Sequence, residues 1–179
     1  MGHTRNISLL VLGAAMVSLI FAINSSYAQN EKYRAKLDGD NEIPAVNTTS
    51  EAVINFKTKG DAMTWKMNVT GFADATGANI IKGKIGQSKD VVVDLLKVSK
   101  HSNNPKGMTM RGNITASSLT GSLSGKTLDD LKTAMAGNDT FVNIHTKGHP
   151  DGEIAGMIKV KGAGSNATTP TTAETNSTG

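Results

Sequence analysis

The sequence predicts an all-β domain, in the form of an antiparallel sandwich or barrel with one short helix. Two observations carry this prediction. Between Lys32 and Val160, apolar residues recur mainly at every second position, which is the period of a half-buried strand. Gly-rich turns separate many short segments of this kind, and the segments do not alternate with helices as they would in a parallel sheet.

The N-terminus indicates a signal peptide ahead of this domain. His3 and Arg5 precede an apolar run from Ile7 to Ile23, and Ser26-Tyr27-Ala28 offers the small residues that a signal peptidase inspects. We therefore expect a signal peptide over residues 1–28, with cleavage after Ala28, and a secreted or cell-surface protein. The alternative is an uncleaved leader that serves as a membrane anchor.

The clearest strand pair is a hairpin around the turn Lys59-Gly60-Asp61. Apolar residues alternate with mostly polar ones from Ala52 to Lys57, and again from Met63 to Val69. Trp65, the single tryptophan, falls on the apolar face of the second segment. We expect it to anchor the core, because a large aromatic side chain on such a face is most often buried.

Four further strands are predicted. Asp90 to Leu96 contains three consecutive valines and predicts a strand covered on both faces, or an edge strand under a loop. After a loop predicted from His101 to Gly107, Met108, Met110 and Ile114 share one face, where methionine packing is favoured over thioether ligation of a soft metal. The last two strands, Thr140 to Thr146 and Glu153 to Val160, flank a turn at Pro150-Asp151-Gly152.

One short helix is predicted between Thr127 and Gly137. Thr127 and Asp130 have the spacing of an N-terminal cap, apolar residues follow at helical spacing, and Gly137 stands where the helix would end.

Beyond Val160 the chain holds only small and polar residues, which predicts a disordered tail over residues 161–179. The domain is therefore expected over residues 29–160.

Composition excludes several classes of function. The chain has no cysteine, which excludes disulfides, thiolate metal sites and cysteine nucleophiles.

The chain carries 19 Lys+Arg against 15 Asp+Glu, and without Arg5 of the leader the net charge of the mature chain is only +3. Its cations are spread along the sequence with little aromatic interleaving, so nucleic-acid binding is not expected. The spread includes Lys57, Lys59, Lys66, Lys82, Lys84, Lys89 and Lys97.

Two segments at opposite ends of the domain resemble the CHRD domain, a family named after chordin. Phe141 to Thr146, followed by His149 to Gly156, is similar to that family's closing motif. Leu37 to Val46 is similar to its opening pattern L-x-G-x-x-E-x-P-P-V, and the helix predicted from Thr127 to Gly137 also fits. The resemblance covers Tyr33 to Val160.

The resemblance implies an immunoglobulin-like β-barrel or sandwich with a distant likeness to copper/zinc superoxide dismutases. Many microbial members have a His-Ile-His triplet before a glycine, which invites comparison with paired metal-binding histidines. The matching stretch here, Ala78 to Gly83, has Asn79 and Ile81 at the two histidine positions. This departure argues against inherited metal binding.

His145 and His149 are the remaining candidates for a metal site. They stand four residues apart, with Asp151 and Glu153 close behind, and two imidazoles with a carboxylate could bind Zn²⁺ or Cu²⁺. We favour the alternative of a hydrogen-bonded strand histidine and a plain turn, and therefore expect no cofactor. The family-motif residues singled out as site candidates are Asn143, His145, Thr146, Pro150, Asp151, Gly152 and Glu153.

No catalytic constellation is found in the sequence. It has no Gly-x-Ser-x-Gly elbow, and no His-Asp partner can be assigned to a serine or threonine. Asp38, Asp40 and Glu42 form an acidic cluster without the dense ligand spacing of a calcium loop, so we interpret it as a solvated turn. His101 is expected to be a solvated loop residue.

Asn-x-Ser/Thr triplets are frequent and make the chain a candidate glycoprotein. Chance triplets in an Asn- and Thr-rich sequence are the alternative. The candidate acceptors are Asn47, Asn68, Asn113, Asn138, Asn166 and Asn176.

The function predicted from these observations is that of a non-enzymatic extracellular domain with a binding or cell-surface structural role. Its partner would be an extracellular or cell-surface component, contacted through strand edges and the loops at Asp38 to Val46 and His145 to Glu153. The alternative is a copper- or zinc-binding, superoxide-dismutase-like protein with a degenerate histidine set. A catalytic dismutase needs an open redox metal position, for which too few imidazoles remain.

Overall fold

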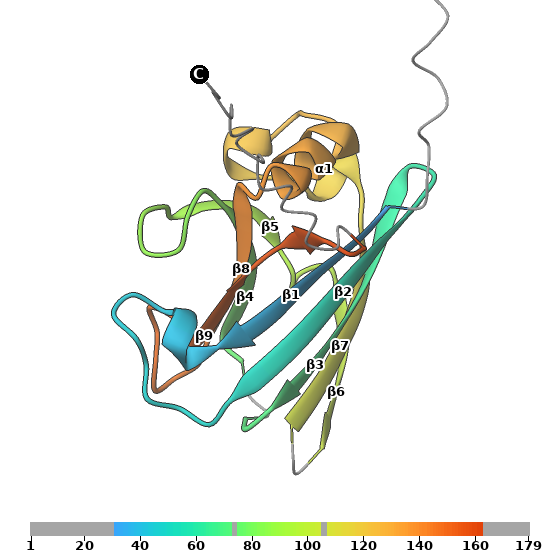
Figure 1. Cartoon of the computed structure of the whole chain (residues 1–179). Coiled ribbons are helices and arrows are strands. Elements are labelled where there is room, and N and C mark those ends of the chain that lie inside the picture. Colours follow the sequence, from blue (N-terminus) through green and yellow to red (C-terminus); the bar gives the residue numbers. More distant parts are fainter. Residues whose placement is uncertain (1–30, 73–74, 105–106, 163–179) are drawn as a thin grey trace, which may run out of the picture.

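A computed structural model describes residues 31–72, 75–104 and 107–162 of the chain. The expected leader and nearly all of the expected tail lie outside these residues. Within them the fold is mostly β, with one antiparallel sheet that curls into a half-barrel and one short helix (Figure 1). The ten strands are β1 Lys32–Asp38, β2 Glu51–Lys59, β3 Ala62–Thr70, β4 Gly77–Lys82, β5 Asp90–Asp94, β6 Ser99–Asn104, β7 Gly107–Ile114, β8 Thr140–His145, β9 Ile154–Met157 and β10 Lys159–Val160.

The strands follow the order β5-β4-β8-β9-β1-β2-β3-β7-β6, and β10 also pairs with β1. Every strand pair is antiparallel. The all-β, antiparallel class predicted from the sequence is therefore confirmed, together with its single α-helix. This strand order does not confirm an immunoglobulin-like or superoxide-dismutase-like topology, which stays a prediction.

The core lies on the inner face of the curled sheet. Strict alternation puts the odd-numbered residues of β1 and β3 inside, as in the burial of Tyr33, Met63 and Met67. Trp65 is only 3% exposed and belongs to the main core cluster, as predicted. The predicted hairpin of β2 and β3 is confirmed in register from Glu51↔Thr70 to Lys59↔Ala62.

Helix α1, Leu128–Ala136, packs against this core at one end of the sheet (Figure 1). Its predicted cap is confirmed, because the Thr127 hydroxyl accepts from the Asp130 backbone N–H at 3.3 Å, and the Asp130 carboxylate accepts from the Thr127 N–H at 2.8 Å. Gly137 caps the C-terminus. Three short 3₁₀ turns complete the connections: η1 Gly39–Asn41, η2 Ala116–Ser118 and η3 Gly121–Leu123.

The edge strand β5 lies under a loop, which was one of the two alternatives for its valine run. The Thr120 backbone N–H donates to the Val92 carbonyl at 2.9 Å, and the Ser122 N–H donates to the Asp90 carboxylate at 3.0 Å. The hydrogen bonds from Ser122 lower the pKa of Asp90. This edge of the sheet is therefore partly covered by the chain itself.

Two local predictions are wrong. The segment predicted as a loop from His101 to Gly107 includes residues 101–104 of strand β6, which pairs with β7 from Ser99↔Gly112 to Asn104↔Gly107. Its residues are polar, so the alternation of apolar and polar residues that predicts a half-buried strand is missing. Polar and charged residues are common in edge strands. The predicted last strand is also interrupted: β9 pairs with β8 and, at Ala155, with β1, whereas β10 pairs with β1, and the Ile158 N–H between them donates to Thr140 O at 3.0 Å.

No helix within the described residues is long and apolar enough to cross a lipid bilayer.

Candidate functional site

The fold brings the opening and closing family motifs together at one end of the molecule. The segment around η1 lies against the connection from β8 to β9 (Figure 1), and Asn41 Nδ2 donates to the Ala155 carbonyl at 3.1 Å. The side chains that meet there form what we call the motif cluster. Its members are Glu42, Thr48, Ser50, Asn143, Thr146, Gly152 and Glu153.

Glu153 lies at the centre of the hydrogen bonds in this cluster and is 8% exposed. Its carboxylate accepts from three hydroxyl groups, Thr48 at 2.9 Å, Ser50 at 2.7 Å and Thr146 at 2.6 Å. Burial raises the pKa of Glu153, but the hydrogen bonds from the three hydroxyl groups and an electrostatic contribution from His149 outweigh it, so that the pKa is lowered overall. A buried, ionised carboxylate with every donor on this chain is a structural lock that joins two distant segments.

Glu42 is the second buried carboxyl of the cluster, and it corrects the prediction of a solvated acidic turn. It is 9% exposed, and burial raises its pKa to about 7 from an ordinary value of 4.5. Among the described residues, its Oε1 atom has no hydrogen-bond partner, and neither has Oδ1 of Asn143. Asp38, by contrast, caps η1 by accepting from the Asn41 N–H at 3.1 Å.

Glu42 Oε1 and Asn143 Oδ1 both lie close to the backbone of Gly152. Its φ of +139° is disfavoured for residues with a side chain. A Cβ at this position would lie 2.6 Å from Glu42 Oε1 and 2.7 Å from the Asn143 amide. Glycine is therefore required both by its backbone conformation and by the close packing of two polar side chains above it.

The two candidate metal ligands flank the same turn. His145 is half-buried at the end of β8, and its Nδ1 atom lies 2.9 Å from the Pro150 carbonyl, to which the ring N–H donates. His149 is also half-buried, and Asp151 is exposed. In the part of the chain that the structure describes, no three His, Asp or Glu side chains come together in a way that could hold a metal ion. His101 lies in strand β6 rather than in a loop.

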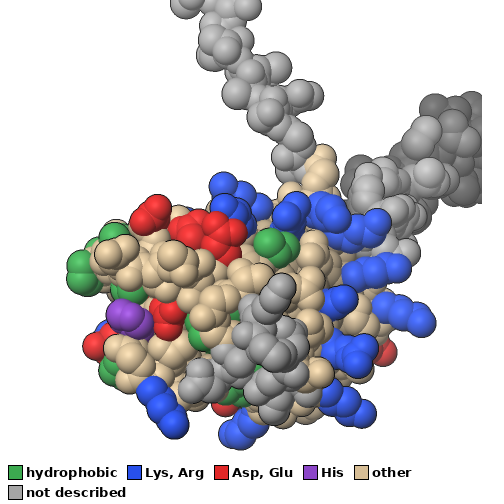
Figure 2. Space-filling model, turned by 90° about the horizontal axis from the view of Figure 1, so that it is seen from below, with side chains coloured by type: hydrophobic (Ala, Val, Ile, Leu, Met, Phe, Trp, Pro, Cys, Tyr) green, Lys and Arg blue, Asp and Glu red, His purple; other side chains and the backbone are tan. Residues whose placement is uncertain are grey.

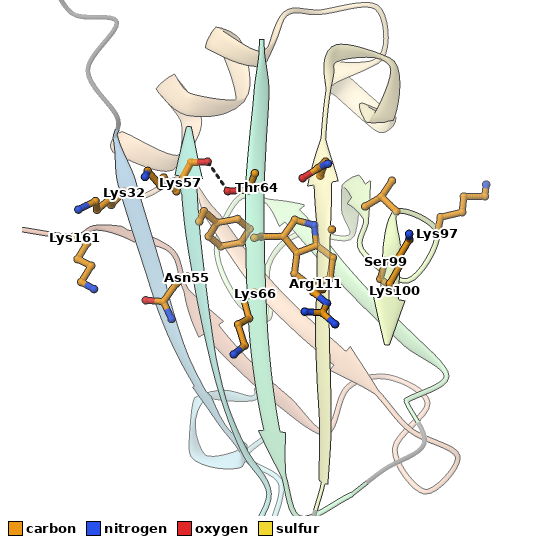
Figure 3. Close-up of a pocket in the computed structure, with 15 residues that line it drawn as sticks. Lys32, Asn55, Lys57, Thr64, Lys66, Lys97, Ser99, Lys100, Arg111 and Lys161 are labelled. Carbon is orange, nitrogen blue, oxygen red and sulfur yellow. Dashed lines mark hydrogen bonds between the residues drawn. The ribbon is translucent and has the colours of Figure 1, made fainter. Parts of the chain in front are cut away.

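A different feature stands out on the outer face of the sheet, where a groove of about 890 Å³ crosses β1, β2, β3, β7 and the approach to β6. We call it the basic groove. Among its described lining residues are seven cations and no acid (Figure 3). The cations are Lys32, Lys57, Lys66, Lys97, Lys100, Arg111 and Lys161; the polar residues between them include Asn55, Thr64, Ser99 and Asn113.

Strand pairing explains why these cations gather. Lys66 on β3 is the register partner of Arg111 on β7, which in turn pairs with Lys100 on β6. Lys57 on β2 pairs with Lys32 on β1 in the same way. Partners in an antiparallel pair point to the same face, so like charges stand side by side there. Figure 2 shows Lys and Arg side chains gathered along one side of the molecule.

The charge of the basic groove is not neutralised by the described part of the chain. The ion pairs found there join Lys36 to Glu51 at 3.8 Å, Lys82 to Asp139 at 3.3 Å, and Lys132 to Asp129. None of them involves a lining residue of the groove. Directly opposed like charges repel one another and destabilise a sheet, and this face therefore carries a concentrated positive charge.

Sequence reasoning missed this groove because it judged the lysines by their spacing along the chain. Lys57, Lys66 and Lys97 were counted as scattered, yet all three line the groove. The predicted hairpin could have revealed part of the groove, because the turn at Gly60 determines which residues of β2 and β3 are neighbours. Residues 101–104 of the partner strand β6, directly after Lys100, were predicted as part of a loop.

The candidate glycosylation sites are exposed where the structure describes them. Asn47, Asn68, Asn113 and Asn138 lie at the surface, whereas Asn166 and Asn176 fall outside the described residues. Asn113 lines the basic groove. A sugar attached there would occupy the groove, so modification of Asn113 and ligand binding at the groove exclude each other.

The comparisons with known proteins give one finding about the whole domain. The family model of the CHRD domain matches residues 33–158, which include both motifs and every strand except β10. Neither a search of curated proteins nor one of solved structures finds a match.

Proposed function

This chain belongs to the CHRD domain family, and we propose that it is an exported, non-enzymatic domain that binds anionic groups at the cell surface through its basic groove. The observation that carries the proposal is the gathering of seven cations, without an acid, around one open groove. Export is proposed from the N-terminal apolar run and the small residues before Ala28. The signal peptide, the domain and the tail keep the boundaries given above.

The non-enzymatic part of the proposal rests on how the motif residues are used. The carboxylate of Glu153 is held by three hydroxyl groups, and the side chain of Glu42 is buried. Neither faces the basic groove, whose described lining residues include no histidine or carboxylate that could act as a general base. The motif cluster therefore supports the fold, and the groove supports binding.

Retention on native envelopes tests this proposal. Washed envelopes of the source organism are mixed with the purified mature protein, and the bound fraction is measured at increasing salt. We expect binding that salt elutes and that the combined replacements Lys66→Gln, Arg111→Gln and Lys100→Gln reduce strongly, because they remove charge from one register row. Equal retention of this variant and the parent would contradict the proposal.

The alternative function is metal binding, as a protein distantly related to copper/zinc superoxide dismutases. One observation favours it: the ring N–H of His145 donates to the Pro150 carbonyl, an arrangement that often orients a metal-binding imidazole. Metal analysis of the mature domain separates the two functions. Stoichiometric copper or zinc that disappears on His145→Ala plus His149→Ala replacement would favour the alternative.

A further inference from the structure

We infer that the ligand of the basic groove is a linear anionic polysaccharide that lies across the strands of the sheet. The inference rests on the proposed function, because it names the ligand class of the same surface. It is drawn from the arrangement of the cations, from the groups that lie between them, and from what the groove lacks.

Three cations of the groove, Lys66, Arg111 and Lys100, belong to a row that runs perpendicular to the strands, and the row continues beyond the groove's lining residues to Arg34 and Lys159. We call it the cationic row, and it follows the register from β10 through β1, β2, β3 and β7 to β6. Five of its six residues are cationic, and all six are exposed. The row consists of Lys159, Arg34, Asn55, Lys66, Arg111 and Lys100.

The length of the row favours a polymer over a small anion. Neighbouring strands lie about 4.8 Å apart, so five steps span about 24 Å. A small anion would contact two or three of these side chains and leave the other charges unpaired. A chain with charges repeated along a line engages them all, and one strand spacing is close to the advance of one sugar ring along an extended polysaccharide.

The neutral residues of the groove fit the hydroxyl groups of such a chain. Asn55 interrupts the cationic row, and a second row pairs Lys57 with Thr64 and Thr64 with Asn113. Figure 3 shows Lys57 and Thr64 beside one another on the sheet, with the Thr64 hydroxyl donating to the Lys57 carbonyl at 3.2 Å. Amides and hydroxyls between cations supply the hydrogen bonds that sugar rings need between their charged groups.

The groove lacks what a single-stranded nucleic acid requires. Bases stack on exposed aromatic side chains. The aromatic residues that line the described groove, Phe56 and Trp65, are 1% and 3% exposed and turn into the core. The expected signal peptide adds an independent reason, since it would place the domain outside the cytoplasm, where charged polysaccharides are common surface polymers.

Binding of purified polymers to the mature protein tests the inference. The probes are polygalacturonate and heparin as carboxylated and sulfated polysaccharides, dextran as the neutral control, single-stranded DNA, and vesicles of phosphatidylglycerol with phosphatidylcholine. We expect one of the charged polysaccharides to bind more tightly than DNA or vesicles, with affinity that falls as salt rises, and no binding to dextran.

Two matched triple variants separate the position of charge from its amount. Lys66→Gln, Arg111→Gln and Lys100→Gln should weaken binding by about tenfold or more. The control removes the same charge from exposed lysines outside the groove, Lys89→Gln, Lys126→Gln and Lys147→Gln, and should weaken binding far less. Circular dichroism shows whether both variants keep the fold. Equal losses in the two variants would overturn the inference.

The remaining outcomes are also decisive. Tighter binding to DNA or to vesicles overturns the polysaccharide but leaves anion binding at the groove intact. Groove-dependent retention on envelopes, without binding to either charged polysaccharide, likewise overturns the polysaccharide as ligand and leaves anion binding at the groove intact. Failure of both the envelope and the polymer experiments overturns the proposed function together with the inference.

Discussion

Replacing Glu42 by glutamine should stabilise the protein at neutral and alkaline pH. Glu42 is 9% exposed, and its Oε1 atom has no hydrogen-bond partner in the described structure. Burial raises its pKa to about 7. Glutamine has nearly the same shape without the ionisable group, so Glu42→Gln removes the cost of ionising a buried carboxyl.

The size and sign of the effect follow from the two pKa values. The folded-state pKa of about 7 compares with an ordinary value of 4.5 in the unfolded chain. Below pH 4.5 the carboxyl is neutral in both states and has no effect on stability. As the pH rises from 4.5 to 7, only the unfolded state loses its proton, so the native state is destabilised by a total of about 3 kcal/mol, which then stays constant.

Urea unfolding from pH 4 to pH 8, followed by the fluorescence of the buried Trp65, measures this difference. Glu42→Gln should match the parent near pH 4 and exceed its free energy of unfolding by about 3 kcal/mol at pH 8. Glu51→Gln is the control, because Glu51 is exposed and its ion pair with Lys36 is a surface pair worth at most about 1 kcal/mol. A Glu42→Gln variant less stable than the parent at pH 8 would refute the reasoning.

Three further predictions concern stability, measured by the same urea unfolding. Gly152→Ala should cost about 3 kcal/mol or more, because the new Cβ meets polar atoms at 2.6–2.7 Å, whereas Gly60→Ala, also at positive φ but in open space, should cost only about 1 kcal/mol. Lys66→Gln should raise stability by about 0.5 kcal/mol at low salt and leave it unchanged at high salt, since it relieves repulsion from Arg111; a loss at low salt would speak against that repulsion. Thr127→Ala should cost about 1 kcal/mol through the lost helix cap, and an unchanged free energy of unfolding would contradict the cap's role.

Local patterns in the sequence were enough to predict the strands and helix whose signals lie within one segment. The hairpin of β2 and β3 follows from two alternating runs around one turn, and α1 follows from a cap pair at Thr127 and a terminal Gly137. Strand β6 could not be found in this way, because its polar residues lack the alternation of a half-buried strand. The break at Ile158 follows from the pairing with β8, which β9 makes and β10 does not, and no local pattern contains this information.

For the candidate site, the sequence could identify the residues of each motif separately but not the contacts between the motifs. The motifs around Glu42 and Glu153 were identified, but their burial depends on segments about a hundred residues apart in the chain coming together. Glu42 therefore looked like part of a solvated acidic turn, although its carboxyl lies over Gly152 in the folded protein. Polarity alone did not distinguish a surface turn from an internal lock.

The division between motif cluster and basic groove has a consequence for how function varies in such a fold. The motif residues hold distant segments together, so a change at Gly152 or Glu153 acts on folding first. The groove residues point outward from strands whose inner faces carry the core, so Lys66 or Arg111 can change while Trp65 and its neighbours stay packed. A shared motif thus predicts a shared scaffold, while the proposed ligand surface of this chain consists of outward positions that alternate with the core residues and that the motif does not include.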